Sequence, residues 1–292
     1  MAVATEEPLV SVIMSMRNAS TTVLDTIRSL QWQTLNAWEL VLFDDGSTDD
    51  SASVVQSVSD KRIRLQKDSQ RKGLATRLNE AVALARGRFI ARIDADDICF
   101  PVRLEKQVAY LESHPDVDVV ASRAVVFSGR DLIGVMPVGS DHRDIIREPL
   151  RGFPFPHPTW CGHAEWFRAN PYDGSLRKTQ DQDLLLRTCA RSTFGGMSDI
   201  LVGYRQPKLE IGKLLRGRFI FARSMWQYGR ALAPVSSVIG GMAVQVAKAA
   251  ADIVTLGLGF NRWGQLRRLQ PVPRNVQDEW PALCDRLQSG GR

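Results

Sequence analysis

Three aspartates stand in the tetrad Asp94-Ala95-Asp96-Asp97, directly after an apolar run that ends at Ile93. Such a run predicts a buried strand, so we expect the carboxylates to project together from the rim of a sheet, where nothing neutralises them. Hard oxygen ligands of this kind suit Mg²⁺ or Mn²⁺, with the remaining positions left to water and substrate phosphates. The tetrad therefore predicts a metal site for a diphosphate substrate, although an isolated Asp-x-Asp is more often a solvated acidic loop.

The segments around this tetrad alternate between strand-like and helix-like patterns. Apolar runs predict strands at residues 9–14, 38–43, 63–66 and 89–93, and helical spacing predicts helices at 21–33, 54–58 and 74–86. This alternation indicates an α/β fold with a mainly parallel sheet, helices on both faces and ligands at the carboxyl ends of the strands. A second acidic pair, Asp44-Asp45, ends the second predicted strand, so both clusters belong at such ends.

The pattern becomes less regular after the tetrad. We expect a helix opened by Pro101, followed by a strand with a hairpin at 117–130, an irregular segment at 152–158, a helix at 181–191 and a strand at 200–204. The compact domain then closes near Gln206. The chain is thereby divided into a domain at 1–206 and a basic helical extension at 207–292.

Charge is distributed unevenly along the chain. The net charge is +6, yet the residues from Leu201 onward hold 14 Lys and Arg against 5 Asp and Glu. A solvated basic face or a nucleic-acid partner is the usual explanation of such a bias. The four cysteines stand far apart, which argues against a zinc site. Residues 1–8 lack the apolar run of a secretory signal, so we expect a cytoplasmic location.

The extension combines basic and apolar side chains at helical spacing. A helix predicted at 208–230 carries one basic stripe and one apolar stripe, formed by Lys213, Arg216, Arg223 and Arg230 and by Leu215, Phe219, Ala222 and Trp226. This pattern is typical of a helix in a membrane interface, and nucleic-acid binding would not need so large an apolar surface. Residues 231–247 are free of charge, but Pro and Gly interruptions favour an interfacial or re-entrant hairpin over a span. A hairpin packed on the first domain is the competing interpretation.

Several motifs in this order resemble those of family 2 glycosyltransferases of the GT-A fold, in particular those of bacterial polysaccharide biosynthesis. They are Asp44-Asp45-Gly46-Ser47-Thr48-Asp49, Lys72-Gly73-Leu74 with Leu78-Asn79, the tetrad with residues 103–107, His157-Pro158-Thr159 and Asp181-Gln182-Asp183-Leu184. Each motif is a weak signal alone, but together they cover roughly residues 9–206. The resemblance implies a nucleotide diphosphate sugar as donor.

The resemblance also implies roles near the donor. It places the metal on Asp94 and Asp96, where the ion bridges the donor diphosphate, and it counts Asp94 among the donor-binding residues. It places Asp44 and Asp45 beside the nucleoside and Lys72 in the donor site. For the Asp44-Asp45 pair, a helix N-cap arrangement with the following Ser and Thr is the competing interpretation.

Transfer to a hydroxyl needs a base that takes the hydroxyl proton. The resemblance places this base at Asp181, within Gln180-Asp181-Gln182-Asp183, where family members carry Glu-Asp-x-Asp. Because Gln180 replaces an acid whose charge would raise the pKa of the base, Asp181 could be less basic here. The competing interpretation is a first-turn acid favoured by the helix dipole, which we expect of Asp183.

Other residues near the motifs have two open interpretations each. Arg71 could pair with phosphate, stack on the base or point to solvent. Trp160, His163 and Trp166 could form a sugar-stacking platform, although aromatic residues at this spacing are more often core. His157 is expected near the acceptor and without a catalytic role.

These expectations converge on a metal-dependent, inverting glycosyltransferase. It would move a sugar from a nucleotide diphosphate sugar to a hydroxyl acceptor such as a lipid-linked saccharide, at the inner face of the cell membrane. A sugar-phosphate nucleotidylyltransferase is disfavoured because no Gly-rich basic loop follows the first strand. The non-enzyme alternative is an inactive nucleotide-sugar-binding or membrane-scaffold protein, which Gln180 keeps open and the intact Asp94, Asp96 and Asp181 argue against.

Overall fold

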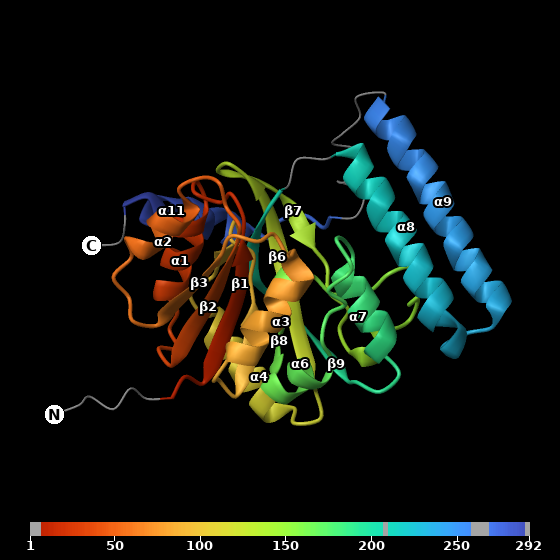
Figure 1. Ribbon diagram of the computed structural model, residues 1–292, viewed down its shortest axis with the longest axis horizontal. Coiled ribbons are helices and arrows are strands. Elements are labelled where there is room, and N and C mark those ends of the chain that lie inside the picture. The colour runs from red at the N-terminus through yellow and green to blue at the C-terminus, as the bar shows by residue number, and fades with distance from the viewer. Residues whose placement is uncertain (1–6, 207–209, 258–268, 290–292) are drawn as a thin grey trace.

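The computed structural model describes residues 7–206, 210–257 and 269–289. Within these ranges a mixed nine-stranded sheet has the order β3-β2-β1-β4-β8-β6-β9-β5, and β7 pairs with β6 (Figure 1). The strands are β1 (Val10–Met16), β2 (Trp38–Asp45), β3 (Ile63–Asp68), β4 (Phe89–Arg92), β5 (Ile98–Cys99), β6 (Val119–Ser128), β7 (Asp131–Met136), β8 (Cys161–His163) and β9 (Phe194–Arg205).

The sheet consists of two parallel groups joined by an antiparallel strand. β3, β2, β1 and β4 run parallel, and so do β6 and β9. The short β8 is antiparallel to both β4 and β6 and lies between the groups. The predicted α/β fold with helices on both faces is thus confirmed, whereas β5 and β8 were not predicted because two or three residues carry no periodic pattern.

Helices cover both faces because successive residues of a strand point to opposite sides. In β2, Leu40 and Leu42 enter the core that α1, α2 and α4 cover, whereas Val41 and Phe43 enter the core that α3, α6 and α7 cover. The helices of this part are α1 (Val23–Gln31), α2 (Ser51–Gln56), α3 (Leu74–Leu84), α4 (Arg103–Ser113), α5 (His142–Ile145), η1 (His157–Thr159), α6 (Ala164–Ala169) and α7 (Gln180–Thr188).

The predicted strand at 200–204 is longer in the structure. β9 begins at Phe194 and pairs with β6 through two irregularities in register. Its first half contains Gly195, Gly196 and Asp199, which hide the apolar pattern of a strand.

The C-terminal part forms two separate packing units. The helices α8 (Ile211–Tyr228) and α9 (Val235–Gly257), joined through η2 (Gly229–Ala231), form a hairpin against α7 at one end of the molecule (Figure 1). The helix α11 (Arg274–Ser289) lies at the other end and buries Trp280 against Phe127 of β6, with ring centroids 4.8 Å apart. The predicted boundary near Gln206 therefore separates α11 from strands with which it shares a core.

Candidate active site

Both acidic clusters lie at one edge of the sheet. Asp44 and Asp45 end β2, the tetrad follows β4, and β1 lies between these two strands. The parallel registers pair Met16 of β1 with Asp44, and Ile13 of β1 with Arg92. The carboxyl ends of parallel strands are the usual place for ligands in open α/β sheets, so this edge is the candidate site.

Three carboxylates of the tetrad crowd together. Ligand oxygens of Asp94, Asp96 and Asp97 all lie within 4.8 Å of one another. Burial, together with the charges of its two neighbours, holds the pKa of Asp97 well above its usual range, and burial and Asp94 raise the pKa of Asp96. The backbone N–H of Arg205 donates to Asp97 Oδ1 at 2.9 Å, whereas Oδ2 is buried without a partner among the described residues. These three carboxylates fit a hard divalent cation, because such an ion would relieve the repulsion between their negative charges.

A buried cation faces this cluster. Arg92, the last residue of β4, is 2% exposed and donates through Nη2 to Asp94 Oδ1. Its Nε and Nη1 are also buried and have no hydrogen-bond partner within the described part of the chain. Burial raises the pKa of the predicted base Asp181, and the charge of Arg92 is among the influences that oppose this rise. Sequence reasoning missed Arg92 because it took the residue as part of the apolar run.

Asp181 lies in the first turn of α7 and is partly buried. Burial raises its pKa, and hydrogen bonds from Gln182, including one from Nε2 at 3.4 Å, oppose that rise only in part. Burial thus supplies basicity that the acid replaced by Gln180 would otherwise provide. Asp183 has a structural role instead, since it accepts from Arg187 Nε at 2.8 Å and from Ser224 Oγ at 2.6 Å.

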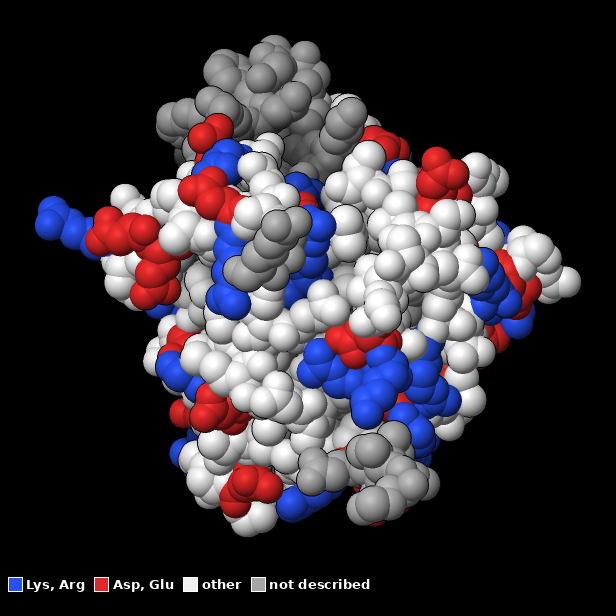
Figure 2. Space-filling model, turned by 90° about the vertical axis from the view of Figure 1, so that its left-hand side faces the viewer, with Lys and Arg blue, Asp and Glu red and all other residues white. Residues whose placement is uncertain are grey.

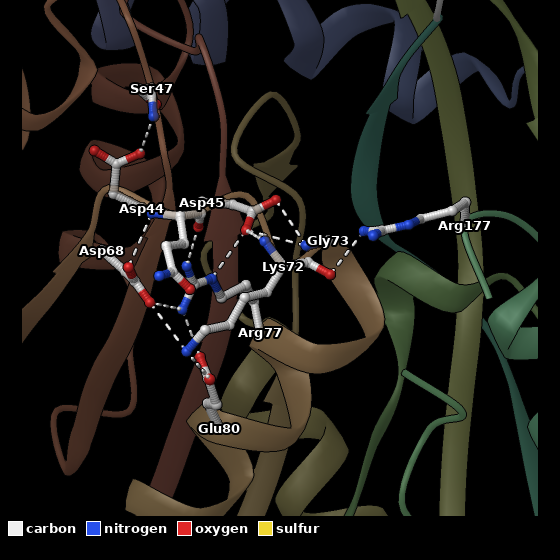
Figure 3. A network of polar contacts seen from close by, with 10 residues as sticks. Asp44, Asp45, Ser47, Asp68, Lys72, Gly73, Arg77, Glu80 and Arg177 are labelled. Atoms are coloured by element: carbon white, nitrogen blue, oxygen red, sulfur yellow. Dashed lines mark hydrogen bonds and ion pairs between the residues drawn. The ribbon is translucent and has the colours of Figure 1, made fainter. Parts of the chain in front are cut away.

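Asp45 is the centre of a polar network at the carboxyl end of β2 (Figure 3). Its carboxylate accepts from the backbone N–H groups of Lys72 at 2.7 Å and of Gly73 at 3.0 Å, and from Arg77 Nε at 2.9 Å. Arg77 is 1% exposed and also contacts carboxylates of Asp68 and Glu80. Asp45 therefore fixes the turn at Lys72-Gly73.

Asp44 and Lys72 have different surroundings. Asp44 Oδ1 accepts from the backbone N–H of Ser47 at 2.9 Å, which closes a turn after β2. This contact is not the helix N-cap of the competing interpretation, because α2 begins at Ser51 and its N-cap position is Asp50. The Lys72 ammonium pairs with Asp68 at 3.0 Å and with Glu80 at 2.9 Å, so its charge is already balanced within the network.

Arg177 connects this network to the segment before α7. Its Nη1 donates to the Lys72 carbonyl at 2.7 Å (Figure 3). Gly73 has a φ of +91°, and a Cβ there would lie 2.2 Å from Arg177 Nη1. Only glycine fits this turn without displacing Arg177.

Two of the three residues considered for sugar stacking belong to the core, and His163 is partly buried. Trp160 and Trp166 are 0% and 6% exposed, so the stacking interpretation is wrong for both. His163 packs on the Phe89 ring. His157 is buried with Nε2 at 2.8 Å from the hydroxyl of Tyr172, and burial holds its pKa well below its usual value.

Comparison with protein families and curated proteins agrees with this geometry. Residues 11–172 match the family described as Glycosyl transferase family 2. The putative glycosyltransferase EpsE of Bacillus subtilis is 39% identical over 189 residues, which are 62% of this chain and 66% of EpsE. WfgD of Escherichia coli, named a UDP-Glc:alpha-D-GlcNAc-diphosphoundecaprenol beta-1,3-glucosyltransferase, is 41% identical over 106 residues, which are 36% of this chain and 42% of WfgD.

Solved structures show the same fold. S. aureus TarS in complex with UDP-GlcNAc superposes with a TM-score of 0.63 at 16% identity, over 95% of this chain and 81% of that chain. The mannosyltransferase PcManGT of Pyrobaculum calidifontis, in complex with GDP-Man and Mn²⁺, gives 0.58 at 18% identity, over 99% and 89%. The family match covers more than half of the chain, and the chain therefore belongs to glycosyl transferase family 2 and has the GT-A fold.

Proposed function

We propose that this protein transfers a sugar from a nucleotide diphosphate sugar to a hydroxyl group of a saccharide acceptor. The observation that carries the proposal is the cluster of Asp94, Asp96 and Asp97 beside the buried Arg92, at the carboxyl ends of the parallel strands. Family membership supports the reaction class. The complex of PcManGT with GDP-Man and Mn²⁺ supports a nucleotide sugar with Mn²⁺ or Mg²⁺.

On the donor side, each residue has a separate task. Asp94 and Asp96 would hold the divalent ion, with Asp97 beneath them. When bound, the ion supplies positive charge that stabilises the leaving diphosphate. Asp44 accepts hydrogen bonds from the nucleoside, while Asp45 and Lys72 shape the donor site through the turn that they form together.

On the acceptor side, Asp181 takes the proton of the attacking hydroxyl at its carboxylate. Its raised pKa suits this task, because a more basic carboxylate accepts the proton more readily. A base that lies across the anomeric carbon from the diphosphate directs a single displacement, so we propose inversion at that carbon.

The acceptor that we propose is a lipid-linked saccharide of polysaccharide biosynthesis. WfgD, which this chain resembles over 106 residues, is named for a diphosphoundecaprenol acceptor. An enzyme with such an acceptor and a nucleotide sugar donor would work at the inner face of the cell membrane as a peripheral protein. Nucleic acid has no place in this reaction.

Donor turnover tests the proposal. Purified protein is incubated with Mn²⁺ or Mg²⁺ and a panel of nucleotide sugars, and free nucleoside diphosphate is measured with and without EDTA. We expect release from one donor or a few related donors, and loss of that release in EDTA. Absence of release from every donor, with and without lipid-linked saccharide acceptors, would contradict the transferase assignment.

A further inference from the structure

The exposed apolar side chains of this protein are concentrated on the hairpin of α8 and α9. Among the described residues nine large hydrophobic side chains are exposed, and all except Leu84 lie on this hairpin, namely Ile211, Phe219, Trp226, Val235, Ile239, Val246, Ile253 and Val254. The stretch Val235–Thr255 contains 18 consecutive residues with a mean hydropathy of 1.4, and only 17% of these residues are buried. Contiguous exposed apolar surface on a globular protein indicates an interaction site.

The charges of α9 are turned toward the protein. Lys248 donates to the Arg151 carbonyl at 3.2 Å, and Asp252 accepts from Arg218 Nε at 2.7 Å. Lys248 and Asp252 are the only charged residues between Val235 and Thr255, and both are partly buried. The exposed side of this 21-residue stretch, about 31 Å long, therefore carries no charge.

The exposed side of α8 is different, because cations and aromatic rings alternate on it. Arg216, Phe219, Arg223, Trp226 and Arg230 are exposed and follow one another at steps of three and four residues, so they share one face. Instead of the two separate stripes expected from the sequence, the structure thus has one mixed face. None of these three arginines forms an ion pair with a described carboxylate, and the Arg230 guanidinium lies 4.9 Å over the Trp226 ring.

The far end of the molecule has an ordinary surface by comparison. Figure 2 shows the face near α1, α2 and α11, where basic and acidic side chains lie among uncharged ones and several basic side chains gather in one patch. Interspersed charge of both signs is typical of a solvated surface. The exposed side of α9, which carries no charge, therefore differs from this face.

We propose that the α8–α9 hairpin lies on the surface of an anionic lipid bilayer. Arg216, Arg223 and Arg230 would contact lipid phosphates, while Phe219, Trp226 and the exposed side of α9 enter the boundary between head groups and acyl chains. The helix α9 lies along the membrane instead of crossing it, because contacts of Gly241, Lys248 and Asp252 attach it to the rest of the protein along its length.

This surface is fixed to the helix that carries the proposed base. Ser224 of α8 donates to Asp183 of α7 at 2.6 Å, and a Cβ at Gly217 of α8 would lie 3.5 Å from Thr179 at the start of α7. Membrane docking through the hairpin would thus hold Asp181 close to acceptors that the membrane carries. The inference about the acceptor rests on the proposed function, whereas the docking surface itself can be tested without turnover.

Vesicle sedimentation of the full chain tests the basic part of this surface. We expect binding to vesicles of phosphatidylcholine with phosphatidylglycerol, weaker binding to phosphatidylcholine alone, and loss of binding in high salt because exposed charges are screened. The triple variant Arg216→Gln, Arg223→Gln, Arg230→Gln should bind about a hundredfold more weakly, at about 1 kcal/mol for each cation. A matched triple variant with the same charge change on exposed residues elsewhere, Lys61→Gln, Lys67→Gln and Arg274→Gln, should bind like the natural chain. Equal losses in both triple variants would overturn the proposal, since only net charge would then matter.

A second pair of variants tests the apolar part. Val246→Glu places a charge on the exposed side of α9 and should abolish vesicle binding, whereas Leu84→Glu makes the same change outside the hairpin and should have no effect. The competing occupant is a second copy of this chain. A lipid-free dimer in analytical ultracentrifugation that Val246→Glu dissociates, together with no binding to anionic vesicles, would overturn the membrane proposal. Asp96→Asn should bind vesicles like the natural chain. Vesicle binding therefore tests the docking surface independently of whether the protein transfers a sugar.

Discussion

At the scale of single residues, the buried guanidinium of Arg92 distinguishes this site from a solvated acidic loop. Three carboxylates that crowd at the end of a buried strand repel one another, and two of them have raised pKa values for that reason and through burial. Arg92 offsets part of this repulsion through Asp94, while two of its N–H groups remain without a partner among the described residues. A cation in this position offsets part of the repulsion within the cluster without any bound ion.

Replacement of this cation should destabilise the metal-free protein. Arg92→Met leaves the cluster without its counter-charge, and we expect a loss of about 2 kcal/mol or more in the free energy of unfolding, since breaking a fully buried pair costs about 3–5 kcal/mol and Asp94 is partly exposed. Mn²⁺ should restore part of this loss. Urea unfolding with and without Mn²⁺ measures both effects. Unchanged stability in both conditions would show that Arg92 does not balance the cluster.

Replacement of the proposed base should slow the chemical step. Asp181→Asn should lower the transfer rate by roughly 10²–10⁴ and leave donor affinity nearly unchanged. Because burial raises the pKa of Asp181 above 3.8, transfer by the natural chain should fall as the pH drops through that raised pKa and protonates the base. Single-turnover rates across pH measure this acid limb, which the variant should lack. Lost donor binding with normal turnover of bound donor would instead make Asp181 a positioning residue.

At the scale of elements, the sequence predicted the helices and strands whose hydrophobic pattern is local, but not the contacts between residues that are distant in the chain. The tetrad after β4 was predicted as a site because a strand pattern and an acidic motif stand next to each other in the chain, whereas the role of Asp181 in the first turn of α7 came from the resemblance to the family. The ionic networks were not found, because they join residues that are distant in sequence, such as Asp45 with Arg77. The single exposed face of α8 was also missed, since the contacts of α8 with α7 and α9 decide which side stays exposed.

The ionic network around Asp45 should be the main polar contribution to the free energy of unfolding near the carboxyl end of β2. Arg77→Met leaves Asp45 buried without its cation, and we expect a loss of about 3–5 kcal/mol in the free energy of unfolding. Arg147→Met is a control, because the Arg147–Asp144 pair is more exposed and should contribute about 1 kcal/mol or less. Urea unfolding of both variants makes the comparison. Equal losses in the free energy of unfolding would indicate that the buried network contributes no more to stability than an exposed ion pair.

At the scale of the whole molecule, the C-terminal helices are part of the fold. The helix α11 places Trp280, which is 2% exposed, in the core beside β5, β6 and β7, and α8 packs Phe221 and Met225 into the core that α7 shares. The sequence pattern suggests that residues 1–206 fold alone, but this packing argues that the sheet needs both later segments.

Removal of these segments should expose apolar core. A chain that ends at Gln206 should aggregate, and Trp280→Ala in the full chain should lower the free energy of unfolding by about 3–5 kcal/mol. Light scattering of the shortened chain and urea unfolding of the variant measure the two effects. A soluble, monomeric shortened chain with native-like stability would show that the first 206 residues are an independent domain after all.

The most direct measurement of divalent-ion-dependent transfer at the Asp94–Asp97 cluster compares Asp96→Asn with the natural chain in Mn²⁺. Nucleoside diphosphate release and donor binding are measured for both, with Asp116→Asn as a control at an exposed carboxylate elsewhere. We predict that Asp96→Asn loses turnover and metal-dependent donor binding while its unfolding midpoint stays at least as high, because the pKa of Asp96 shows that its charge is unfavourable in the folded protein. Retained turnover in Asp96→Asn, or full activity of the natural chain in excess EDTA, would contradict the metal-dependent mechanism.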